Sequence, residues 1–188
     1  MSESMITKKA IADSLKELTR HKTFNKISIS DITKECNLNR QTFYYHFQDK
    51  YELLDWIYYN YTFKSLIENI SFDNWNDRLM ELLEIMKKEE TFYMNTIKCS
   101  ENYFEEYLFK LLVVLFKAAI DALDDDEKLP EDEKNVFARF FSHGLCGIII
   151  DWAINGMKES VEELNRHIKY LVISSEKAAY KHFINESS

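Results

Sequence analysis

The spacing of apolar residues along this chain is that of α-helices from near its first residue to near its last. Ile11, Leu15 and Leu18 follow one another at intervals of four and three, which places them on one face of a helix over residues 7–21. Similar intervals recur in the later segments. We therefore predict an all-α fold of about nine helices, over residues 7–21, 29–36, 40–47, 50–68, 73–88, 91–97, 101–123, 131–155 and 159–183.

Two short helices near residue 30 have clear end signals. Ser28 and Asp31 form a capping-box pattern, in which the hydroxyl accepts a backbone N–H and the carboxylate reaches back to the first N–H. Asn37 tolerates the left-handed conformation of a tight turn, and Asn39 is a good N-cap for the helix that follows. Two helices joined in this way predict a helix-turn-helix.

The chain divides near residue 50. Asp49 and Glu52 repeat the capping-box pattern and open the helix over 50–68. We assign residues 1–50 to a three-helix head and residues 51–188 to a regulatory and dimerisation body built as a helical bundle. An acidic stretch followed by Pro130 marks a solvated loop before the last two helices.

Charge is the part of the composition that bears on partners. The 188 residues carry a formal net charge of −8 at pH 7. Residues 1–50 hold nine Lys/Arg against six Asp/Glu, a net of +3, whereas residues 51–188 hold fifteen against twenty-six, a net of −11. A mildly basic head on an acidic body is compatible with a nucleic-acid partner for the head alone.

The remaining composition indicates a cytoplasmic helical protein. The first 129 residues contain neither Gly nor Pro, which argues against a sheet with tight turns. Three widely spaced cysteines, Cys36, Cys99 and Cys146, read as reduced thiols. Apolar runs fall short of the ~20 residues of a membrane span, and residues 1–9 do not resemble a signal sequence. We expect no membrane partner.

The second helix of the helix-turn-helix has an apolar and a polar side. Phe43 and Phe47 face inward, and the outward residues are Arg40, Gln41, Thr42, Tyr44, Tyr45 and His46. Such a helix can lie in the major groove of DNA, ~12 Å wide, with its first residues at base edges. The alternative is an aromatic helix that serves only for packing.

The residues around this helix resemble a known family. The run over 32–47, which ends in Phe43-Tyr44-Tyr45-His46-Phe47, is followed by Lys50 and Glu52-Leu53-Leu54. Together they closely resemble the DNA-binding head of the tetracycline-repressor (TetR) family of regulators. The resemblance covers residues 6–57, and the body matches in length and helicity.

This resemblance implies a contact to an operator in double-stranded DNA for each of eight residues. Those expected at base edges are Arg40, Gln41 and Thr42, with Arg40 suited to guanine and Gln41 to adenine. Those expected at the phosphate backbone are Ser28, Tyr44, His46 and Lys50, with Tyr45 beside them. Lys50 would be helped there by the start of its helix.

The last two helices are the candidate dimer element. One head reads only a few base pairs, so a homodimer on a palindromic operator is expected. Glycines allow close helix approach and large apolar side chains supply area, which selects Phe141, Gly144, Ile148, Trp152, Leu164, Ile168 and Leu171. The alternative is that these stripes pack only within one chain.

The middle of the chain is rich in aromatic residues. The TetR resemblance implies a small-molecule pocket in the body, and we select Tyr58, Tyr61, Trp75, Tyr93 and Tyr107 as candidate ligand contacts, with ordinary core packing as the alternative. His143 and Cys146 stand three residues apart without further ligands, so neither a metal site nor a cofactor is expected.

A narrower resemblance concerns the regulated genes. Residues 40–47 and Glu52-Leu53-Leu54 with Trp56-Ile57 are similar to regulators of dihydroxyacetone kinase operons in Gram-positive bacteria, which are linked to activation through a partner protein that senses dihydroxyacetone. A small-molecule effector and a protein co-regulator both remain open, as do activation and repression. Catalytic motifs such as HExxH and glycine-rich phosphate loops are lacking, so an enzyme is not expected. The alternative function is a helical interaction module whose head no longer binds DNA.

Overall fold

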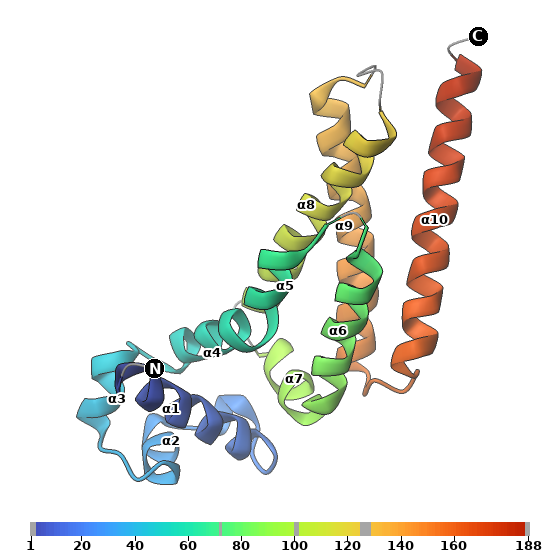
Figure 1. Cartoon of the computed structure of the whole chain (residues 1–188). Helices are drawn as coiled ribbons and strands as arrows, with labels where there is room; N and C mark the ends of the chain where they lie inside the picture. Colours follow the sequence, from blue (N-terminus) through green and yellow to red (C-terminus); the bar gives the residue numbers. More distant parts are fainter. Residues whose placement is uncertain (1–2, 72, 100–101, 125–128, 187–188) are drawn as a thin grey trace.

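The computed structural model describes residues 3–71, 73–99, 102–124 and 129–186, and within these ranges the chain is helical without strands. The head consists of α1 (Glu3–Thr19), the 3-10 turn η1 (Phe24–Lys26), α2 (Ile29–Glu35) and α3 (Arg40–His46). It sits at one end of the molecule, with the body rising away from it (Figure 1). The all-α fold predicted from the spacing of apolar residues is confirmed.

The local signals of the head are confirmed. The Ser28 hydroxyl accepts the N–H of Asp31 at 3.2 Å, and the Asp31 carboxylate accepts the N–H of Ser28 at 2.8 Å. The Asn39 side chain accepts the N–H of Thr42 at 2.8 Å and caps α3. Asn37 has a φ of 53°, the left-handed conformation that its position in the turn requires.

The second capping box is only half formed. Asp49 caps α4 (Lys50–Ile57) by accepting the N–H groups of Tyr51 and Glu52. The Glu52 carboxylate, however, accepts the N–H of Gln48, one residue before the position that a capping box requires. The backbone of Asp49 is fully extended, at φ −153° and ψ −177°. The prediction of a complete box there was wrong.

The helix predicted over 50–68 contains a wider π turn. It runs as α4, then η2 (Tyr58–Phe63), then α5 (Lys64–Asn69). In the π turn Tyr58, Thr62 and Phe63 are all buried. Thr62 and Phe63 follow Tyr58 by four and five residues, and the wider turn places all three side chains on one side of the helix. Counted as one helix, these segments leave the described chain with the nine helices that the sequence predicts.

The body is made of longer helices, which are α6 (Trp75–Lys88), α7 (Glu90–Ile97), α8 (Tyr103–Leu123), α9 (Glu131–Ile154) and α10 (Val161–Glu186). α8 packs along α9, α10 packs on α6, and α7 packs on α9 (Figure 1). α9 has the length and apolar composition of a membrane span, but 39% of that window is buried inside the protein. One side of α9 is buried in the protein, and apolar residues remain exposed on its other side.

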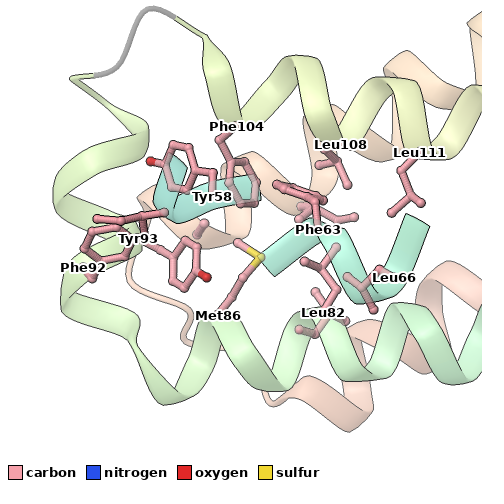
Figure 2. Close-up of a cluster of buried hydrophobic side chains, with 14 of the residues drawn as sticks. Tyr58, Phe63, Leu66, Leu82, Met86, Phe92, Tyr93, Phe104, Leu108 and Leu111 are labelled. Atoms are coloured by element: carbon pink, nitrogen blue, oxygen red, sulfur yellow. The ribbon is translucent and has the colours of Figure 1, made fainter. Parts of the chain in front are cut away.

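The centre of the body is a filled aromatic and aliphatic core (Figure 2). Its hydroxyl groups are paired inside it, because Tyr58 donates to Thr96 Oγ1 at 2.8 Å and the oxygens of Thr62 and Tyr93 lie 2.7 Å apart. Buried polar groups satisfied in this way cost little and favour one packing arrangement. The core therefore ties the π turn to α7.

Candidate nucleic-acid interface

α3 presents the polar surface that the sequence predicts. Phe43 and Phe47 are buried and anchor the helix to the head. On the opposite side Arg40 and Gln41 are exposed, and the outer aromatic residue, Tyr45, is 83% exposed. Large aromatic side chains are left in water at a cost unless something covers them, so this surface suits a partner.

Thr42 and Tyr44 complete this surface. Tyr44 is exposed and packs edge-on against Phe43, with ring centroids 5.7 Å apart. The Thr42 hydroxyl donates to the Asn39 side chain at 3.0 Å, so its proton is already used inside the cap. Its methyl group and oxygen lone pairs are what remain for a base edge.

His46 lies at the end of α3 beside a residue that the sequence reasoning did not select. Burial, and then the charge of Lys8, lower the pKa of His46 below its ordinary value of 6.5. Lys8 comes from α1, and its ammonium lies 5.3 Å from the centre of the Phe47 ring. The sequence feature that could have indicated Lys8 is the basic pair Lys8-Lys9, but these residues were considered only as part of the helix over residues 7–21.

Lys50 has a different environment from the one expected. Its ammonium donates to the backbone carbonyls of Phe24 at 2.9 Å, Asn25 at 3.2 Å and Ile27 at 3.0 Å. Burial lowers the pKa of this group. Because an ammonium has three N–H donors, a phosphate contact would require one of these bonds to be given up.

Ser28 is also engaged within the head. Its hydroxyl bonds the Asp31 carboxylate at 2.8 Å, and that carboxylate pairs with the Lys22 ammonium at 2.7 Å. The hydrogen bond from Lys22, followed by those from Ser28, holds the pKa of Asp31 well below its usual range. The hydroxyl keeps lone pairs for other donors, but its proton serves the capping box.

The five candidate ligand residues do not all surround one cavity, although Tyr61 and Tyr93 both line a pocket of about 250 Å³. Tyr58 and Tyr93 are fully packed in the core (Figure 2). Tyr61 lies against α1, with the Lys16 ammonium 5.1 Å from its ring centre. Trp75 borders an apolar cavity of about 30 Å³, near the volume of one water molecule. The Tyr107 hydroxyl donates to Asp55 at 2.9 Å. Tyr58 and Tyr93 are thus part of the core packing, and a role of the five residues in ligand binding stays a prediction.

The seven dimer candidates divide into two groups. Trp152, Leu164 and Ile168 are buried within the single chain, so their side chains pack internally. Phe141 is half-buried and stacks on Phe116 with ring centroids 5.5 Å apart. The residues of the set that remain exposed are Gly144, Ile148 and Leu171. Further exposed apolar residues on α9 and α10, which the sequence reasoning missed, are Val136, Phe140 and Tyr170.

A capped helix with an exposed polar side, presented by a three-helix head on a helical body, defines the class of helix-turn-helix transcription regulators. Residues 11–57 match the family described as "Bacterial regulatory proteins, tetR family", and residues 73–174 match the "Transcriptional regulator C-terminal region" associated with it. The chain belongs to the TetR family, and the resemblance noted from the sequence is confirmed. Regulators of this family bind DNA operators as dimers.

The chain is similar over nearly its whole length to three further proteins. The HTH-type dhaKLM operon transcriptional activator DhaS of Lactococcus lactis subsp. lactis is 30% identical over 175 residues, which is 93% of this chain and 92% of the relative. A solved structure of a dihydroxyacetone kinase operon activator DhaS is 31% identical, with a TM-score of 0.72 over 93% of this chain and 98% of that one. NalD of Pseudomonas aeruginosa, at 18% identity, has a TM-score of 0.65 over 92% of this chain and 97% of its own, and shows the fold alone.

Proposed function

We propose that this regulator binds a palindromic operator as a homodimer in the cytoplasm and controls genes for dihydroxyacetone kinase. The observation that carries the DNA-binding part is the exposed side of α3, where Arg40, Gln41, Tyr44 and Tyr45 project from a helix anchored by buried phenylalanines. The gene assignment is supported by the two relatives that carry that name along nearly their full length.

The residues of the DNA surface take separate roles in this proposal. Arg40 and Gln41 stand in the first turn of α3, where side chains meet base edges, and Arg40 pairs with guanine through two hydrogen bonds. Tyr44 and His46 contact phosphates, and Tyr45 lies beside them. Lys8 joins the phosphate set from α1, because it shares the end of α3 with His46.

The test begins with a duplex chosen by the protein itself. The wild-type chain selects bound sequences from a random DNA pool, and the upstream region of the dihydroxyacetone kinase genes is then searched for the selected sequence. Arg40→Ala is expected to weaken binding to that duplex and to relax base preference at one position by ~1–3 kcal/mol. Lys88→Ala, which removes an exposed basic side chain on the body, serves as the control. Unchanged base preference in Arg40→Ala would remove the assigned role.

For the effector, we propose a protein co-regulator in preference to an enclosed small molecule. The hydroxyls of Tyr58 and Tyr93 are paired internally, and the apolar cavity beside Trp75 has about the volume of one water. A larger, partly open pocket of about 250 Å³ lies beside Tyr61, but its charged side chains Lys16 and Glu89 already pair with each other at 2.9 Å. Small-molecule sites need free polar groups that orient the ligand. Dihydroxyacetone alone is therefore expected to leave the operator complex unchanged, whereas dihydroxyacetone with extract of the source cells should alter it. A change caused by dihydroxyacetone with purified protein would contradict this proposal.

A further inference from the structure

Asn95, on α7 of the body, makes hydrogen bonds to three backbone groups of the head. Its Oδ1 accepts the N–H of Phe24 at 2.8 Å, and its Nδ2 donates to the carbonyl oxygens of Thr19 and Lys22, both at 2.9 Å. Thr19 is the last residue of α1, where carbonyls lack partners inside the helix, and Phe24 begins η1. A single amide therefore holds both sides of the corner between α1 and η1.

These partners require an amide side chain. Two carbonyl oxygens need donors and one N–H needs an acceptor, and only Asn or Gln carries both on one planar group. A carboxylate in this position would face two carbonyl oxygens. Alanine would leave three part-buried backbone groups without their partner. The contact is thus specific to the amide as well as to the position.

A second link joins the same two helices. The Lys16 ammonium pairs with the carboxylate of Glu89, the N-cap residue of α7, at 2.9 Å. Lys16 and Thr19 are three residues apart, so they lie on the same side of α1. Two attachment points on that side, one to Glu89 and one to Asn95, restrict rotation of α1 on α7.

α7 is itself fixed to the body. Thr96, next to Asn95, accepts the Tyr58 hydroxyl from the π turn at 2.8 Å, and Tyr93 pairs with Thr62. On another side α7 packs against α9, the helix whose exposed apolar residues are proposed for the dimer, and it lies between the head and the lower end of α9 (Figure 1). Besides the continuous segment α4–η2–α5, α7 is therefore a contact that orients the head relative to the dimer surface.

We propose that Asn95 is a positioning residue for operator recognition, which sets the orientation of each head and hence the separation of the two recognition helices in the dimer. This inference rests on the proposed binding of a palindromic operator. Two half-sites are engaged ~34–36 Å apart, one turn of DNA. The second head increases the affinity for the operator only if it is held at that separation. A loosely held head has a lower effective concentration at its half-site. Asn95 contacts the head and not the DNA.

The experiment compares Asn95→Ala with Asn155→Ala, which removes a side chain that donates to Asp151 at the end of its own helix. Dissociation constants are measured by fluorescence anisotropy for the duplex selected by the wild type, for a single half-site, and for duplexes with one or two base pairs inserted at the centre. Asn95→Ala is expected to lose about tenfold on the full operator, to keep its half-site affinity, and to discriminate less against the insertions. Asn155→Ala should match the wild type.

Equal losses on the full operator and the half-site, or no loss on either, would overturn the inference. If Asn95→Ala does not fold, Glu89→Gln tests the second link, and it is expected to lose affinity for the full operator while its half-site affinity is unchanged. A Glu89→Gln variant that binds the full operator as tightly as the wild type, or that loses half-site affinity equally, also overturns the inference. Failure of the wild type to select any sequence would reject the proposed function itself, which makes the two failures distinguishable.

Discussion

The ammonium of Lys50, the first residue of α4, lies 2.9 Å from the backbone carbonyl oxygen of Phe24, at the start of η1. It also lies 4.7 Å from the centre of the Phe24 ring. Two segments 26 residues apart are thereby joined at the edge of the helix-turn-helix. A residue expected from the sequence at a phosphate is used in this structure to hold the head together.

Lys50→Ala is therefore expected to destabilise the protein. It removes a charged donor from three carbonyls, two of them part-buried, and the expected loss in the free energy of unfolding is ~1–3 kcal/mol. Urea denaturation followed by circular dichroism measures this loss, with Lys64→Ala, an exposed lysine on α5, as the control. If Lys50→Ala kept full stability yet bound all DNA sequences more weakly, the phosphate contact first expected would be the correct role.

Lys8→Ala should weaken binding to all duplexes alike. A phosphate contact releases a counterion, so the slope of log affinity against log salt concentration should become shallower by about one unit. Base preference should stay as in the wild type, because Lys8 lies near the C-terminal end of α3, away from the first turn of α3 that meets the bases. Fluorescence anisotropy over a range of salt concentrations tests this, with Lys88→Ala as the reference. A slope equal to that of the reference would remove Lys8 from the phosphate set.

Operator affinity should rise as the pH falls from about 8 towards 6. In the free protein His46 has a lowered pKa through burial and the nearby Lys8, so it is largely neutral at pH 7. A phosphate beside it favours the charged form, so the complex binds more protons than the free protein and acidification strengthens binding. His46→Gln should flatten this dependence, whereas His21→Gln, which replaces an exposed histidine just after α1, should retain it. Affinity that falls on acidification in the wild type would contradict the phosphate contact.

Phe140→Glu should convert the protein to a monomer. Phe140 is 71% exposed on α9, on the apolar side that also carries Gly144 and Ile148, and a charge there would be buried at the proposed interface. Val114→Glu is a matched control, because Val114 is 62% exposed but belongs to α8. Analytical ultracentrifugation measures whether each variant is a monomer or a dimer. A dimeric Phe140→Glu, or a monomeric Val114→Glu, would place the interface elsewhere.

The limits of the sequence reasoning are clearest for the aromatic residues. The sequence offered Tyr58 and Tyr93 either as ligand contacts or as core residues, because whether such rings line a cavity or fill a core depends on the neighbours that meet them. In the fold Phe104 and Phe92 close around Tyr58, with ring centroids 5.3 and 6.0 Å away. The residues selected for the dimer interface show the same dependence on neighbours. Leu164 and Ile168 lie on one helical stripe, but helices of their own chain cover them.

By itself, the sequence determined the helices, the capped helix-turn-helix and the polar side of α3. These features arise from contacts within a few residues, such as the Asn39 cap and the left-handed Asn37, and from the period of the helix. The tertiary structure alone decided the π turn after α4, the partners of Lys50, the approach of Lys8 to His46 and the three bonds of Asn95. The last three of these join groups far apart in the chain, and their meeting depends on how whole helices pack rather than on any local preference.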